Sequence, residues 1–182
     1  CLFLYVPEFL IFRELGCDRY LAFQLTLIAI RLIGFFALYF LLRRKLALDL
    51  LPSLAGACLF SVSHIYFYSA GHPQLAAVAF VPLLALLLFH YFEAPERRAW
   101  SLWLAAALFG LLFFTGYYIA FFCVLGGATI LAAWVALRLI EDRAGLSYVL
   151  RVGAPKRARD FGIALVVFVC ALAPFLYVYL PV

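Results

Sequence analysis

The chain has 182 residues, of which 69% are hydrophobic and 13% are charged, and its formal net charge is +5. Ordinary soluble domains contain about 45–50% hydrophobic and about 25% charged residues, and a soluble core does not grow fast enough with chain length to bury such an excess. The composition therefore excludes a soluble globular domain. It predicts an all-α fold, a polytopic transmembrane helical bundle with lipid as its main solvent. Because a basic excess in a membrane protein usually reflects its cytoplasmic loops, we expect no nucleic-acid partner.

The first 19 residues precede the first long apolar run. Pro7 and Glu8 are typical of a helix start, and Gly16 is typical of a helix end. The charged side chains of this segment do not share one face of a helical wheel, so it is not a clean amphipathic surface helix. We expect a short helix or re-entrant element at the outer membrane interface, packed on the bundle, which forms the end of an extracytoplasmic loop. It holds three acids: Glu8, Glu14 and Asp18.

The rest of the chain offers six runs of the length that a membrane crossing needs, about 20 mostly apolar residues. Asp18 is a typical N-cap for the first run, and a break at Gly116 divides a long apolar stretch into a tight hairpin. The predicted spans are residues 20–42, 46–68, 73–92, 99–115, 117–140 and 161–180. Residues 141–160 are the one long polar stretch, which we assign to a cytoplasmic loop. We expect Pro174 to be the only proline in the middle of a span.

Lys and Arg are distributed unevenly between the two sides of such a bundle. The positive-inside rule assigns the basic side to the cytoplasm, and both ends of the chain then lie on the extracytoplasmic side. Tyrosines at the outer edge (Tyr66, Tyr68, Tyr117, Tyr118, Tyr177 and Tyr179) and Tyr91, Trp100 and Trp103 at the inner edge fit interfacial aromatic belts. Of the 14 basic residues, eleven fall on the cytoplasmic side: Arg43, Arg44, Lys45, Arg97, Arg98, Arg138, Arg143, Arg151, Lys156, Arg157 and Arg159.

The sequence carries no recognised catalytic or metal-binding signature. The five cysteines are scattered, without a CxxC pair, and offer neither a disulfide framework nor a metal site. No P-loop, nucleophile elbow or GxGxxG fingerprint is present. The chain starts with Cys1, contains no Met and stops directly after an apolar run. We therefore expect it to be an internal fragment of a longer membrane protein.

Arg31 lies near the middle of the first predicted span, in the sequence Ile-Ala-Ile-Arg-Leu-Ile-Gly. A charge at that depth costs from about 2.5 kcal/mol upward and normally faces a partner or a water-filled cavity. One interpretation is a cation for an anionic group such as a lipid phosphate. The alternatives are a structural ion pair, or a helix displaced so that the Arg31 side chain reaches the interface.

Further candidate residues lie in the predicted outer turns. His72 and Gln74 lie where the second and third spans meet, and a histidine there could donate to a phosphate or a sugar hydroxyl. Equally, Gly-His-Pro could form only a turn and the start of a helix. Tyr117 and Tyr118 could line a sugar-binding cavity or belong to the aromatic belt. The two other histidines are less favoured as binding residues, because His64 lies deeper in the second span and His90 is expected to be structural.

Several short motifs carry a family resemblance over nearly the whole chain. They are LYVP at 4–7, GFFALYFLLRR at 34–44, FS at 60–61, AGHPQLAAVAFVPLLALLL at 70–88, LLFFTGYYIAFF at 111–122 and ALAPFLYVYLP at 171–181. With these motifs the chain resembles the middle of bacterial GT-C-type glycosyltransferases, in particular their YfhO-type branch. The resemblance implies a multi-pass protein of the bacterial plasma membrane that uses a polyprenyl-phosphate-linked sugar donor on the extracytoplasmic face.

The resemblance does not assign a catalytic residue in this chain. It implies a catalytic acid in the first outer loop, soon after a span that would precede Cys1. What remains of that loop offers Glu8, Glu14 and Asp18 as candidate catalytic acids, with Arg31, His72, Gln74, Tyr117 and Tyr118 as candidate substrate-binding residues. No cofactor is evident. Sugar transfer could use a divalent metal ion, but no residue pattern supports one.

Two other classes of function are compatible with the sequence. A transporter or flippase segment would have no chemistry, and such proteins usually show inverted repeats with helices broken at paired positions. A non-catalytic membrane scaffold is the third alternative.

For an enzyme we expect a cavity that opens outward, covered by residues 1–19 and bounded below by the outer ends of the first four spans. Arg31 or His72 would line this cavity, and at least one of the three acids would lie at its rim.

Overall fold

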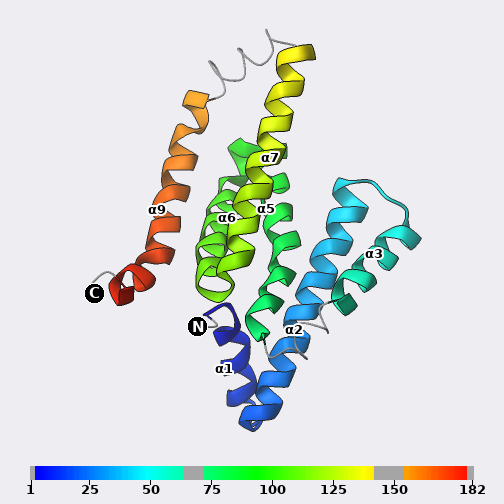
Figure 1. The fold of residues 1–182 in the computed structure, drawn as a ribbon, viewed down its shortest axis with the longest axis vertical. Coiled ribbons are helices and arrows are strands. Elements are labelled where there is room, and N and C mark those ends of the chain that lie inside the picture. The colour runs from blue at the N-terminus through cyan, green and yellow to red at the C-terminus, as the bar shows by residue number, and fades with distance from the viewer. Residues whose placement is uncertain (1–2, 64–71, 142–153, 180–182) are drawn as a thin grey trace.

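The structure, a computed structural model, describes residues 3–63, 72–141 and 154–179. Over these ranges it is entirely helical, as predicted, with seven α-helices and no strand. Four stretches are long and apolar enough to cross a membrane: Arg19–Lys45, Pro73–Glu93, Arg98–Thr115 and Tyr117–Leu137. The chain is therefore a helical membrane protein, and the helices labelled α2, α3, α5, α6, α7 and α9 run in alternating directions along the bundle (Figure 1).

The N-terminal segment is a short helix that packs on the bundle, as predicted. A 3-10 turn, η1 (Phe3–Tyr5), leads into α1 (Val6–Glu14), which contacts α2 (Arg19–Phe40). Gly16 takes a φ of 86°, in the left-handed region that favours glycine, and so ends the first helix. Asp18 Oδ1 then accepts hydrogen bonds from the backbone N–H groups of Tyr20 and Leu21 at 2.8 and 3.0 Å. The predicted N-cap is confirmed, and it begins the first long helix.

The end of this helix differs from the prediction. Residues Leu41–Lys45 continue it as a π-helical turn, η2, before the chain reverses. In this turn the N–H of Leu46 bonds to the carbonyl of Leu41, five residues earlier in the chain, whereas an α-helix bonds residues four apart. Ala47 has a φ of 53°, an uncommon conformation for a residue with a Cβ atom.

Helix α3 (Leu50–Ser63) occupies only part of the second predicted span. It begins four residues after the predicted start, because the reversal uses residues 46–49, and its 14 residues give a length of about 21 Å. A helix of that length is shorter than a typical membrane crossing. The remaining residues of this predicted span, 64–68, and His64 with them, lie outside the described residues.

The third predicted span is not a single α-helix. It begins as a 3-10 helix, η3 (Pro73–Phe80), and becomes α-helical in α5 (Val81–Glu93). Pro82 has no N–H to bond the carbonyl of Val78, which is bonded instead by the N–H of Val81. The expectation that Pro174 is the only proline in the middle of a span is therefore wrong, because Pro82 marks this change of helix type.

Close packing of small residues holds α2 against η3. A Cβ atom placed on Gly34 would lie 2.9 Å from the Cβ of Ala79, so only glycine fits there without a shift. Around this contact lies the main hydrophobic core, in which Ile30 and Phe80 are buried. Helices in lipid associate through such close contacts, because the surrounding acyl chains are as apolar as the helix surfaces.

The last three helices form the other half of the bundle. Helix α6 (Pro95–Thr115) is interrupted by non-helical torsion angles at Arg98, and Gly116 separates it from α7 (Tyr117–Glu141). Helix α9 (Ala154–Tyr179) packs along α6, and the rings of Phe109 and Phe168 stack with centroids 5.7 Å apart. Residues 154–160, which the sequence assigned to a loop, are helical and extend α9 beyond the predicted span. Residues 142–153 of that loop lie outside the described part.

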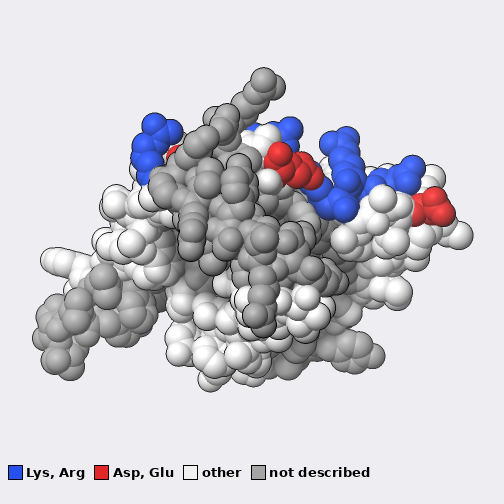
Figure 2. All heavy atoms as spheres, turned by 90° about the horizontal axis from the view of Figure 1, so that it is seen from above, with Lys and Arg blue, Asp and Glu red and all other residues white. Residues whose placement is uncertain are grey.

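Most of the Lys and Arg residues that the structure describes gather at one end of the bundle. This end holds η2, the α5–α6 turn and the start of α9, and Figure 2 shows basic groups across it with acidic groups beside them. Lys45 and Arg98 both contact Glu93, which joins η2 to the α5–α6 turn. Arg13 and Arg19 lie near the α1–α2 turn at the opposite end (Figure 1).

The Gly34–Ala79 contact predicts different effects for the same substitution at two glycines. Gly34→Ala should lower the free energy of unfolding by about 1–3 kcal/mol, because overpacking forces the two helices apart. Gly127→Ala is the matched control, since a Cβ there has no other atom within 4 Å. It should leave stability unchanged or raise it by up to about 1 kcal/mol through helix propensity. Thermal unfolding in detergent, followed by circular dichroism, measures both, and equal melting temperatures for the two variants would contradict the packing argument.

Candidate functional site

Three segments that are far apart in the sequence meet at the end of the bundle opposite the basic end. We name residues 3–5, 72–75 and 115–118 the hairpin-end surface. The Tyr5 hydroxyl donates to the Pro73 carbonyl at 2.8 Å, and the Leu4 N–H donates to Thr115 Oγ1 at 3.1 Å. The Gln74 carbonyl oxygen lies 3.1 Å from where a Cβ of Gly116 would be. The N-terminal turn is thus attached to both η3 and the α6–α7 turn.

Four of the predicted binding residues lie in or next to this surface. His72 Nδ1 and Gln74 Nε2 are 3.2 Å apart, and His72 is exposed. Tyr117 and Tyr118 begin α7, where their side chains are 61% and 68% exposed. Their rings contact each other edge-on, with centroids 5.9 Å apart. The structure therefore brings Gln74 beside the turn that carries the tyrosines, and leaves hydrogen-bonding and stacking groups accessible.

The three predicted acids do not share one location. Glu14 and Asp18 lie in the turn between α1 and α2, which forms the tip of the molecule beyond the hairpin-end surface (Figure 1). Asp18 is occupied as a helix cap, as described above. Glu8, on α1, is half-buried, and its Oε2 is shielded from solvent with no hydrogen-bond partner among the described residues. Of the three carboxylates, Glu8 is thus the one held within the packed structure.

Arg31 lies in the middle of the longest candidate span, the 27 residues of Arg19–Lys45. Its side chain is half-buried, and its Nε is shielded from solvent. The neighbouring Ile30 is fully buried in the main core. The structure therefore places this cation partly inside the bundle, near the middle of the candidate span.

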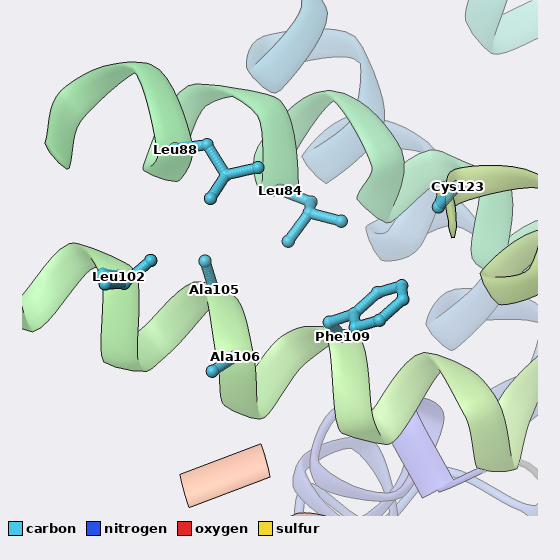
Figure 3. Close-up of a pocket in the computed structure, with 7 residues that line it drawn as sticks. All are labelled: Leu84, Leu88, Leu102, Ala105, Ala106, Phe109 and Cys123. Atoms are coloured by element: carbon cyan, nitrogen blue, oxygen red, sulfur yellow. The ribbon is translucent and has the colours of Figure 1, made fainter. Parts of the chain in front are cut away.

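A cavity of about 230 Å³ lies between α5, α6 and α7 (Figure 3). Its lining is almost wholly apolar, and Leu84 and Leu88 of α5 face Ala105 and Phe109 of α6 across it. A sugar needs hydrogen-bonding groups, so this cavity suits hydrocarbon rather than a glycan. None of the predicted site residues lines it. The outward-opening cavity expected under residues 1–19 stays a prediction.

A buried polar group that the sequence did not indicate lies near the basic end. Tyr91 is fully buried, against Phe161 of α9, and so it does not belong to the interfacial aromatic belt to which we assigned it. Its hydroxyl lies beside the carboxylate of Asp160, which is only 6% exposed. Asp160 had been assigned to a solvated loop. The helix start signal at Ala154-Pro155 is the sequence feature that could have placed it on a packed helix.

Tyr91 contributes to the contact between α5 and α9, because its ring packs edge-on against Phe161 with centroids 5.9 Å apart. Asp160 Oδ1 lies 3.6 Å from Nε of Arg159, whose side chain is 82% exposed, and this pair lies within α9. This arrangement is structural in character and has no access to the hairpin-end surface.

The histidine and cysteine side chains of the described residues offer no further chemistry of their own. Across residues 3–63, 72–141 and 154–179, no three His, Cys, Asp or Glu side chains gather as metal ligands would. His90 Nδ1 lies 3.2 Å from Arg98, and its ring packs edge-on against Trp100. Cys17, Cys58, Cys123 and Cys170 are free thiols.

Comparison of the chain with models of known families, with curated proteins and with solved structures finds no match in any of the three.

The attachment of the N-terminal turn can be tested at Thr115. Thr115→Val keeps the shape of the side chain but removes the acceptor of the buried Leu4 N–H, at a cost of about 1–3 kcal/mol. Hydrogen exchange of residues 4–14 should then become faster. Thr129→Val is the matched control, because the Thr129 hydroxyl bonds only within α7, to the Leu125 carbonyl. Unchanged exchange in Thr115→Val, or equal acceleration in the control, would show that this hydrogen bond does not hold the segment.

Proposed function

We propose that the chain belongs to a multi-pass enzyme of the bacterial plasma membrane that transfers a sugar from a polyprenyl-phosphate donor to a cell-envelope acceptor. The reaction takes place on the extracytoplasmic face, at the hairpin-end surface. The observation that carries this proposal is Arg31, a half-buried cation in the middle of a 27-residue apolar helix. The class of enzyme comes from the resemblance to GT-C-type glycosyltransferases.

A cation at the depth of Arg31 favours a function that requires an anion within the membrane. Its cost, from about 2.5 kcal/mol upward, is offset when the side chain meets an anionic partner or a polar cavity. Guanidinium groups bind phosphate in a fork geometry with two parallel hydrogen bonds. A polyprenyl phosphate carries such an anion on an apolar chain, and departure of the phosphate leaves negative charge that a fixed cation stabilises.

The candidate residues outside the middle of α2 have complementary roles in this proposal. His72 and Gln74 would donate hydrogen bonds to sugar hydroxyls, and Tyr117 and Tyr118 offer rings on which a sugar can stack. Sugar transfer also needs a base that deprotonates the acceptor. Glu8 is the candidate in this chain, because its Oε2 is shielded and has no hydrogen-bond partner among the described residues.

One observation favours the alternative of a transporter or flippase. The candidate span Pro73–Glu93 changes from a 3-10 helix to an α-helix between Phe80 and Pro82, near its middle. Transporters commonly bind substrate where a membrane helix is broken in this way. Such a protein would move a lipid-linked or free solute without making a glycosidic bond. Product analysis therefore separates the two functions.

Substitution of Arg31 tests the enzymatic proposal. Membranes that contain Arg31→Leu should hold the protein at the normal level, while transfer from a polyprenyl-phosphate-linked sugar falls by about 10²–10³-fold. Arg31→Lys should retain part of the activity, since it keeps the charge but loses the fork geometry. Transfer is measured as radiolabelled sugar in the acceptor fraction.

Arg13→Leu is the matched control for this experiment. Arg13 is an exposed cation on α1 that bonds the Cys17 carbonyl, and its loss should leave transfer unchanged. Loss of both protein and activity in Arg31→Leu would instead assign Arg31 to a buried ion pair. Movement of a labelled lipid across the membrane, without any glycosylated product, would favour the transporter.

We also propose that the chain crosses the membrane six times, with its basic end in the cytoplasm and both ends of the chain outside. The basic end holds η2, Arg98 and the start of α9, and the hairpin-end surface contains no Lys or Arg. This asymmetry is the one that the positive-inside rule describes. The count of six requires α3 and α9 to cross together with the four longer helices.

Cysteine labelling in intact cells tests this orientation. In a background without native cysteines, Ser69→Cys should react with an impermeant maleimide added from outside. Ser147→Cys should react only after permeabilisation, because the positive-inside rule assigns the polar stretch 141–160 to the cytoplasm. Labelling of Ser147→Cys in intact cells would contradict the proposed orientation. Labelling of both positions in intact cells would contradict the six-span arrangement.

A further inference from the structure

The basic turn η2 adjoins an exposed apolar stripe on the same helix. Leu32, Phe36 and Phe40 are spaced four residues apart on α2 and are 51%, 51% and 36% exposed. Residues four apart lie on one face of a helix, so these side chains form a continuous strip along the membrane-facing surface. Arg44 comes four residues later, and its guanidinium carbon lies 4.8 Å from the centre of the Phe40 ring. The strip therefore ends in a cation.

The three consecutive basic residues of η2 have different partners. Lys45 is only 14% exposed and contacts both carboxylate oxygens of Glu93, at 2.7 and 2.6 Å. Arg43 donates to the Leu48 carbonyl at 2.9 Å, which holds its exposed side chain at the turn. The guanidinium carbon of Arg44 lies over the Phe40 ring, a cation–π contact that leaves the positive charge of the exposed side chain unneutralised.

Glu93 does not neutralise the two arginines of this turn. Its carboxylate is already paired with Lys45 and, at 3.1 Å, with Arg98. Asp49, exposed at the start of α3, is the other acid nearby in the sequence. The turn and its neighbours thus keep a net positive charge, with four cations against two acids: Arg43, Arg44, Lys45 and Arg98 against Asp49 and Glu93. The positive groups at this end are visible in Figure 2.

We propose that η2 and the adjoining face of α2 bind an anionic phospholipid, with its phosphate at Arg43 and Arg44 and an acyl chain along Phe40, Phe36 and Leu32. The two arginines lie at the end of the candidate span, where a lipid phosphate would lie. The apolar strip runs from them along α2, where an acyl chain would lie. Basic residues at the membrane end of a helix attract anionic headgroups by about 1 kcal/mol each. A free phosphate would use the arginines but not the strip.

Native mass spectrometry of the detergent-solubilised chain tests this site. With equal amounts of phosphatidylglycerol and phosphatidylcholine, the parent chain should retain the anionic lipid preferentially. The double variant Arg43→Gln, Arg44→Gln should lose about tenfold or more of that preference, as expected for two headgroup cations. The control Arg13→Gln, Arg19→Gln removes the same charge from exposed positions at the opposite end and should keep it.

Two further measurements separate a lipid site from a simple anion site. Phe36→Ala should lower retention of phosphatidylglycerol severalfold, whereas Tyr20→Ala, which removes an exposed ring at the other end of α2, should not. Inorganic phosphate in excess should fail to displace the lipid. Equal retention of both lipids, loss of preference in the Arg13 and Arg19 control, or complete displacement by phosphate would each overturn the proposal. Because binding is the readout, the result does not depend on sugar transfer.

Discussion

The arrangement of the first half of the bundle depends on the close approach of α2 to η3 at Gly34 and Ala79. The absence of a side chain on Gly34 lets the two backbones meet, and the buried Ile30 and Phe80 fill the space around that contact. Leu4 and Tyr5 belong to the same core, so the N-terminal turn is seated on surfaces that the contact creates. In lipid, burial of apolar area gives little net drive for helices to associate, and such fits between small residues supply it instead. The order of any site at the hairpin-end surface therefore depends on the packing of α2 against η3.

The signals in the sequence that predicted the fold were local ones. Composition and run length predicted helices, Asp18 its cap, Gly16 the end of the first helix and Gly116 the hairpin, because each depends on a few neighbouring residues. The π-helical turn of η2 and the 3-10 helix of η3 were missed. Hydropathy cannot distinguish helix types, which here depend on Pro82 and on the reversal at Ala47. Residues 154–160 were assigned to a loop, because hydropathy gives no helix signal where a helix continues into charged residues beyond its apolar stretch.

The candidate site was less predictable than the fold, because it depends on which segments meet. Sequence reasoning placed His72, Gln74, Tyr117 and Tyr118 in turns on one side, and the structure brings Gln74 next to Gly116. It could not tell that Asp18 is used as a cap while Glu8 is shielded, since both are acids of one short segment. Nor could it identify the contact of Tyr91 with Asp160, which joins residues 69 positions apart through the docking of α9.

The two ends of the bundle are held together by different interactions: ion pairs at the basic end and neutral hydrogen bonds at the hairpin end. At the basic end, Lys45, Glu93 and Arg98 join η2 to the α5–α6 turn, while Arg43 and Arg44 remain directed to the surroundings. At the hairpin end, neutral hydrogen bonds from Tyr5 and Leu4 attach the N-terminal turn to η3 and to the α6–α7 turn. Arg31 lies between the two ends, in the apolar part of α2, where electrostatic attraction is least screened by water and salt. In our proposal an anionic group reaches Arg31 from the hairpin end, so the proposed chemistry depends on this residue.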